Sequence, residues 1–132
     1  MKTKGLLTIF CMLFLLQQSC NRKEKDENAG KGGNASLNIV LKHHNESKNI
    51  LNGKVYIKYN AQDAPSSFDD SVNCVSIDGV STGTFISLKK GKYYLYGTGY
   101  DTSISQGVKG GLPYTVSEEV SLNITLPVTE AH

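Results

Sequence analysis

The chain has 132 residues, which is enough for one domain with one hydrophobic core. It carries 14 basic and 12 acidic residues, a balance that lacks the strongly basic patch of a nucleic-acid-binding domain. We therefore expect no nucleic-acid partner.

The N-terminus has the organisation of an export signal. Two lysines precede an apolar run over residues 5–16, which is shorter than the roughly 20 residues that a membrane-spanning helix needs. The run ends in LQQSC (residues 16–20), which resembles the lipobox of bacterial lipoproteins. The resemblance implies cleavage between Ser19 and Cys20 and attachment of a diacylglycerol to the Cys20 thiol. Residues 1–19 are thus expected to be a lipoprotein signal peptide, and the lipid on Cys20 to be the link to the membrane.

The segment after this cysteine is polar and rich in charge and glycine. Such a composition cannot bury apolar surface, so we expect residues 20–35 to be a lipidated, flexible tether. Asn21 resembles an outer-membrane sorting context, and the run KEKDE resembles the export tags of surface lipoproteins of the Bacteroidota. A plain spacer is the alternative. The tag would consist of Lys23, Glu24, Asp26 and Glu27. These resemblances imply an outer-membrane protein, lipid-anchored and facing the cell exterior.

From Ser36 onwards, apolar side chains alternate with polar ones, which is the pattern of half-buried β-strands. The alternation predicts strands over residues 37–42 and 54–59. The polar stretch between them closes on Asn52-Gly53, a strong turn signal.

The second half of the chain repeats this alternation between glycine turns. We expect a positive φ at Gly91, and an irregular, glycine-rich segment over residues 97–111. The expected strands are residues 73–77, 84–88, 92–96 and 120–128. Short strands at regular spacing predict an all-β fold, an antiparallel β-sandwich of about seven strands over residues 36–132.

Cysteine usage limits the covalent chemistry of the folded part. Cys11 lies in the signal and Cys20 is the lipidation site, so Cys74 is left alone and no intramolecular disulfide is expected. A lone thiol could form an intermolecular disulfide or be a reactive group, but we expect it to pack as a small apolar side chain.

Four short motifs occur in order within residues 37–128. They are LNGKVYI (51–57), TGTF (82–85), LKKGKYYL (88–95) and Gly99-Tyr100. In this order they resemble the transthyretin-like (prealbumin-like) domains of the carboxypeptidase-regulatory type. The resemblance implies a non-catalytic β-sandwich that serves as an accessory or stand-alone module of the envelope. The C-terminal LPVTE (126–130) also resembles small lipoproteins of the Bacteroidota.

No set of side chains at a recognisable spacing predicts catalysis, so we expect no enzyme activity and no cofactor. His43-His44 and His132 could ligate a metal, but adjacent residues in a strand point to opposite faces and no third ligand is apparent. No metal site is therefore expected. Lys54 and Asn123 could form an isopeptide as in pilus domains, but Gly97 stands where those domains carry the promoting acid.

The loop before residue 73 offers two weaker signals. Asp63, Asp69 and Asp70 could collect a calcium ion but are expected to be solvated carboxylates. The triplet Asp70-Ser71-Val72 resembles the short O-glycosylation signal of exported proteins of the Bacteroidota.

Strand parity predicts one exposed face rich in tyrosine. If residues 55, 57, 93 and 95 point into the core, the intervening side chains point outward. These are Lys54, Tyr56, Lys58, Tyr94 and Tyr96. We expect a structural or accessory module of the envelope, and the alternative is a glycan- or protein-binding module that uses this tyrosine face.

Overall fold

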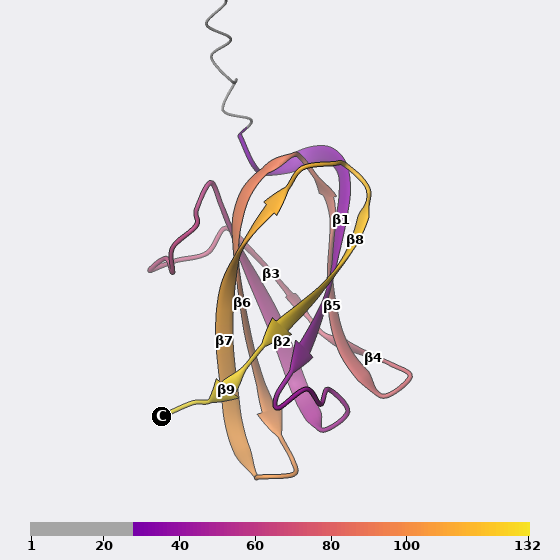
Figure 1. Cartoon of the computed structure of the whole chain (residues 1–132), viewed down its shortest axis with the longest axis vertical. Coiled ribbons are helices and arrows are strands. Elements are labelled where there is room, and N and C mark those ends of the chain that lie inside the picture. The colour runs from indigo at the N-terminus through magenta and orange to yellow at the C-terminus, as the bar shows by residue number, and fades with distance from the viewer. Residues whose placement is uncertain (1–27) are drawn as a thin grey trace, which may run out of the picture.

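The computed structural model describes residues 28–132, and all the regular structure in this range is β-strand (Figure 1). The strands are β1 (Lys31–Lys42), β2 (Ile50–Tyr59), β3 (Asp70–Asn73), β4 (Val75–Ile77), β5 (Val80–Leu88), β6 (Gly91–Asp101), β7 (Gln106–Val116), β8 (Ser121–Pro127) and β9 (Thr129–Glu130). No helix in the described range has the length and apolarity needed to cross a membrane. The expected signal peptide, Ser19, Cys20 and the tag residues 23–27 lie outside the described residues.

The strands form two sheets packed face to face. The first sheet has the order β4-β5-β1-β8 and the second the order β3-β2-β6-β7-β9. The predicted all-β sandwich is therefore confirmed, with nine strands because β4 and β9 are short segments at sheet edges. It departs from a purely antiparallel sandwich in one pairing, since β1 and β8 run parallel from Ser36–Ser121 to Lys42–Pro127.

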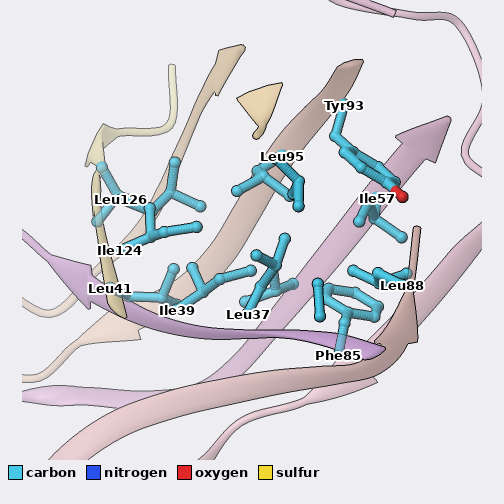
Figure 2. Packing of buried hydrophobic residues seen from close by; sticks show 14 of the residues in the cluster. Leu37, Ile39, Leu41, Ile57, Phe85, Leu88, Tyr93, Leu95, Ile124 and Leu126 are labelled. Atoms are coloured by element: carbon cyan, nitrogen blue, oxygen red, sulfur yellow. The ribbon is translucent and has the colours of Figure 1, made fainter. Parts of the chain in front are cut away.

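Alternate side chains of both sheets point into one hydrophobic core (Figure 2). The first sheet contributes Leu37, Ile39, Leu41, Phe85, Ile124 and Leu126, and the second contributes Val55, Ile57, Tyr93, Leu95, Val108 and Val116. Burying one side chain of this size stabilises the fold by about 1.5–3 kcal/mol. The period-two pattern that predicted the strands therefore also identifies the interaction that holds the sheets together.

The prediction of an irregular segment over residues 97–111 is wrong. β6 and β7 form a continuous antiparallel ladder from Gly91–Val116 to Asp101–Gln106. Its glycines make room for neighbouring side chains: a Cβ at Gly97 would lie 2.5 Å from Leu41 Cδ2 and 2.9 Å from Leu126 Cδ2. Tertiary packing thus outweighs the weak strand preference of glycine.

The turn expected at Asn52-Gly53 is a β-bulge inside β2. Asn52 has a φ of 52°, and the pairing of β2 with β6 changes register between Leu51 and Lys54. Asparagine tolerates the left-handed region that such a bulge requires. The connection between β1 and β2 lies earlier, at residues 43–49.

The start of β1 also differs from the expectation. The strand begins at Lys31, so residues 31–35 of the predicted tether belong to the first sheet. The expectation for Gly91 is confirmed, because its φ is 145° and a Cβ there would lie 2.8 Å from Ala29 Cβ.

Cys74 marks the point where the chain passes from the second sheet to the first, between β3 and β4. The side chain is half-buried and packs against the core, as predicted, and burial raises the pKa of its thiol. Since residues 28–132 contain no other cysteine, this range forms no internal disulfide.

One buried hydroxyl closes the end of the sandwich at which residues 28–30 enter. Tyr93 is 0% exposed, and its hydroxyl accepts a hydrogen bond from Gly30 N at 2.9 Å and donates one to Lys89 O at 2.7 Å. Burial raises the pKa of this phenol, so the neutral donor form persists. The bonds link β6 of the second sheet to the chain just before β1 and just after β5 in the first.

Replacing this hydroxyl tests its contribution. Tyr93→Phe leaves the buried Gly30 N–H without a partner, so we expect the free energy of unfolding to fall by about 1–3 kcal/mol. Tyr94→Phe is the matched control, because the Tyr94 hydroxyl makes no hydrogen bond within residues 28–132. Equal stability of the two variants in chemical denaturation would show that the hydroxyl is not a structural link.

Candidate functional site

The outer face of β2 and β6 carries the side chains that parity predicted. Tyr56 lies opposite Tyr96 in the antiparallel ladder, and Lys58 lies opposite Tyr94. These four and Lys54 are partly exposed, whereas the alternate residues 55, 57, 93 and 95 are buried. The structure thus places the five predicted residues on one face of one sheet.

A phenylalanine that parity could not assign completes this face. Phe68, from the loop between β2 and β3, stacks on Tyr96 with ring centroids 5.5 Å apart and an interplanar angle of 21°. Its ring centroid is 5.3 Å from that of Tyr56, and the Tyr56 and Tyr96 centroids are 6.0 Å apart. We call Tyr56, Phe68 and Tyr96 the aromatic cluster. Sequence gave no signal for Phe68 because its position depends on the path of an irregular loop.

The two lysines of this face have different electrostatic surroundings. Lys54 Nζ lies 5.3 Å from the centre of the Tyr56 ring, within the range of a cation–π contact. Lys58 Nζ lies 3.3 Å from Asp69 Oδ1, and Asp69 also accepts a hydrogen bond from Tyr59 N at 2.7 Å. The charge of Lys58 is therefore balanced by Asp69. Through its bond to Tyr59 N, Asp69 also ties the loop that carries Phe68 to the backbone of β2.

Tyr94 extends the face towards β7. A Cβ at Gly111 of β7 would lie 2.7 Å from the Tyr94 hydroxyl oxygen and 2.8 Å from Cε1 of the ring. The ring therefore lies over the bare backbone of β7. It adds apolar area beside the aromatic cluster without belonging to it.

The two adjacent histidines lie at the far end of β1, in a tight turn. His43 and Glu46 exchange two backbone hydrogen bonds of 2.8 Å, and the central residues His44 and Asn45 have φ values of 47° and 66°. This is the geometry of a type I′ turn. The expectation that His43 and His44 point to opposite faces is wrong, because the strand ends at Lys42 and the ring centroids are 4.0 Å apart.

His43 is buried between two carboxylates. Its Nδ1 lies 2.7 Å from Asp101 Oδ2, and the other Asp101 oxygen accepts hydrogen bonds from the Ser103 amide and hydroxyl at 2.8 and 2.6 Å. The bonds from Ser103 and His43 hold the pKa of Asp101 below its ordinary value. On the opposite side of the ring, Nε2 lies 3.3 Å from Glu130 Oε1.

Glu130 is the residue of this group that sequence reasoning missed. Its own backbone N–H and, more weakly, the nearby histidines lower the pKa of its carboxyl. The parallel pairing of β8 with β1, extended by the bond from Val128 N to Lys42 O at 2.9 Å, brings residue 130 next to His43. A parallel register between residues 80 positions apart or more has no local sequence signal.

The remaining candidates stay apart in the structure. Lys54 and Asn123 lie on different sheets and do not form a pair. Asp70 forms an ion pair with Lys31 at 3.2 Å, and Ser71 lies in β3 opposite Tyr56.

The chain matches no protein-family model, no curated protein and no solved structure. The resemblance to transthyretin-like domains therefore stays a prediction.

The environment of Asp101 predicts a pH effect on stability. A carboxyl whose pKa is lower in the folded state than in the unfolded state stabilises the fold above its ordinary pKa of about 3.9. That contribution is lost as the pH falls below about 4 through the lowered value. As the pH is lowered from 5 to 2, the free energy of unfolding of wild type should therefore fall relative to that of Asp101→Asn.

Chemical denaturation across this range measures the difference. Asp63→Asn, at an exposed loop position, is the matched control and should differ from wild type by a constant amount. A constant difference for Asp101→Asn as well would contradict the lowered pKa.

Proposed function

We propose that this protein is an outer-membrane lipoprotein whose β-sandwich is a non-catalytic accessory module of the envelope, exposed at the cell surface. The observation that carries the proposal is the sequence LQQSC at residues 16–20, preceded by a basic start and a short apolar run. An acyl chain contributes about 0.8 kcal/mol per buried CH₂, and more than one chain anchors a protein stably. A lipid on Cys20 would therefore suffice as an anchor.

The way the chain enters the sandwich fits an N-terminal anchor. Ala29 N bonds to the Asn60 side chain at 2.9 Å, and Gly30 N bonds to the Tyr93 hydroxyl, so the entry point is fixed to the folded domain. β1 then runs for 12 residues, roughly 35–40 Å at about 3.3 Å per residue. The His43 end of the sandwich would face away from the membrane, and the aromatic cluster would lie on its side.

The lipid anchor can be tested at its single acceptor. Cys20→Ala removes the thiol, so the variant should incorporate no labelled fatty acid and should keep its signal peptide. Cys74→Ala is the matched control, since that thiol lies in the folded domain. Partition of a processed Cys20→Ala protein into the detergent phase would contradict the lipoprotein assignment.

A second function is supported by the aromatic cluster. We propose that the outer face of β2 and β6 binds a glycan or another envelope protein. Three rings in mutual contact beside Lys54 make an amphipathic surface of the kind that stacks on sugar rings or on a partner's apolar side chains. Cross-strand packing alone would give the same contacts but no ligand.

Removing the ring at the centre of these contacts separates the two cases. Tyr96→Ala should weaken ligand binding by about 1–3 kcal/mol if the cluster is an anchor. Tyr100→Ala, on the same strand but outside the cluster, should leave binding unchanged. A glycan array and an envelope pull-down measure binding, and thermal melts check the fold. A ligand that tolerates Tyr96→Ala would place the binding surface elsewhere.

A further inference from the structure

We propose that His43, His44 and Glu130 form a binding site for a divalent transition-metal ion, with Zn²⁺ as the best match. One ligand atom from each residue lies within 4.8 Å of the others. Imidazole nitrogen and carboxylate oxygen are both ordinary zinc ligands, and two histidines with one glutamate are an established set.

The buried ring of His43 is oriented by its hydrogen bond to Asp101. The His43 side chain is 2% exposed. A carboxylate can only accept hydrogen bonds, so the 2.7 Å contact with Asp101 places a proton on His43 Nδ1. In the neutral imidazole, Nε2 then presents a lone pair. The carboxylate of Glu130, which is also an acceptor, lies beside that lone pair.

This nitrogen has no hydrogen-bond partner within the described range. Nε2 is buried and makes no hydrogen bond there, although Glu130 Oε1 is only 3.3 Å away. The oxygen lies off the line along which a ring N–H would point. In the neutral imidazole both atoms are acceptors, and two acceptors at this distance repel each other unless a cation lies between them. When Nε2 and a carboxylate oxygen bind the same ion, the ion lies on the axis of the nitrogen lone pair and the oxygen lies to the side of that axis.

The distances from the Glu130 carboxylate to the two imidazoles match those around one ion. Glu130 Oε1 is 3.3 Å from His43 Nε2 and 3.6 Å from His44 Nε2. Tetrahedral zinc with bonds of about 2.0–2.2 Å separates its ligand atoms by about 3.3–3.6 Å. The ligand atoms of the two histidines lie within 4.8 Å of each other, because the type I′ turn places their rings side by side with centroids 4.0 Å apart.

Asp101 acts as the positioning residue of the site. It holds Nδ1 of His43, and its other oxygen is fixed by Ser103. A carboxylate behind a metal-bound histidine sets the tautomer and increases the basicity of the ligating nitrogen. The His44 side chain is 77% exposed, so the fourth position of the ion faces solvent and would be taken by water.

Titration of the full chain with Zn²⁺ tests the site. The protein is purified in detergent without a polyhistidine tag, and its thiols are alkylated. We expect one ion per chain. His44→Ala and Glu130→Gln change partly exposed side chains and should each weaken binding by at least about tenfold. Asp101→Asn should weaken it by about 10–100-fold. Cobalt(II) should give the d–d absorption of tetrahedral coordination, and both ligand variants should lose it.

Two matched controls use groups that are near the ligands in sequence but outside the ligand set. Glu46→Gln changes the carboxylate in the same turn, and His132→Ala changes the imidazole at the C-terminus. Both should bind zinc within about twofold of wild type, a change small against the tenfold loss expected for an outer-shell group. The proposal is overturned if the alkylated chain binds no zinc. It is also overturned if His44→Ala and Glu130→Gln bind as wild type does, or if the controls lose as much affinity as they do.

Discussion

The contact between His43 and Asp101 sets the geometry at one end of the sandwich. Both groups are buried, one following β1 of the first sheet and the other ending β6 of the second. An unpaired buried polar group is costly, so this contact constrains how the two sheets meet. Tyr93 has the same role at the other end, where its hydroxyl joins β6 to Gly30 and Lys89. The apolar core between them supplies most of the stability, and the two polar links define its ends.

The two ends of the sandwich would lie at different distances from the proposed membrane anchor. The Tyr93 link holds Gly30, just before β1 begins, so it would lie at the end nearer to the proposed anchor. The His43 link lies beyond the 12 residues of β1, at the end that would point away from the membrane. The aromatic cluster lies between them on the outer face of the second sheet. Any ligand of the cluster would therefore approach from the side, without contact with the histidine turn.

Strand parity was enough to predict one part of the structure and not another. The inward residues of β1, β2, β6 and β8 and the outward lysines and tyrosines follow from period-two alternation, because burial on one face of a strand fixes the other face. Alternation did not predict the strands within residues 97–111, because glycines there leave room for side chains that are neighbours only in space. These side chains are Leu41, Leu126 and Tyr94. Phe68 and Glu130 escaped it for a related reason. One depends on the path of a loop and the other on a parallel register, and neither is encoded locally.

The path of the C-terminus explains why a site at Glu130 would matter to the whole fold. β8 pairs with β1 in the first sheet, and after Val128 the chain crosses to the second sheet, where β9 pairs with β7 over only two residues. So short a strand gains little stability from its pairing with β7. An ion shared by Glu130, His43 and His44 would hold this last strand to the turn that follows β1, and Asp101 already ties that turn to β6. The same four side chains would then join β9 to both sheets. The metal would have a structural role at this end of the sandwich.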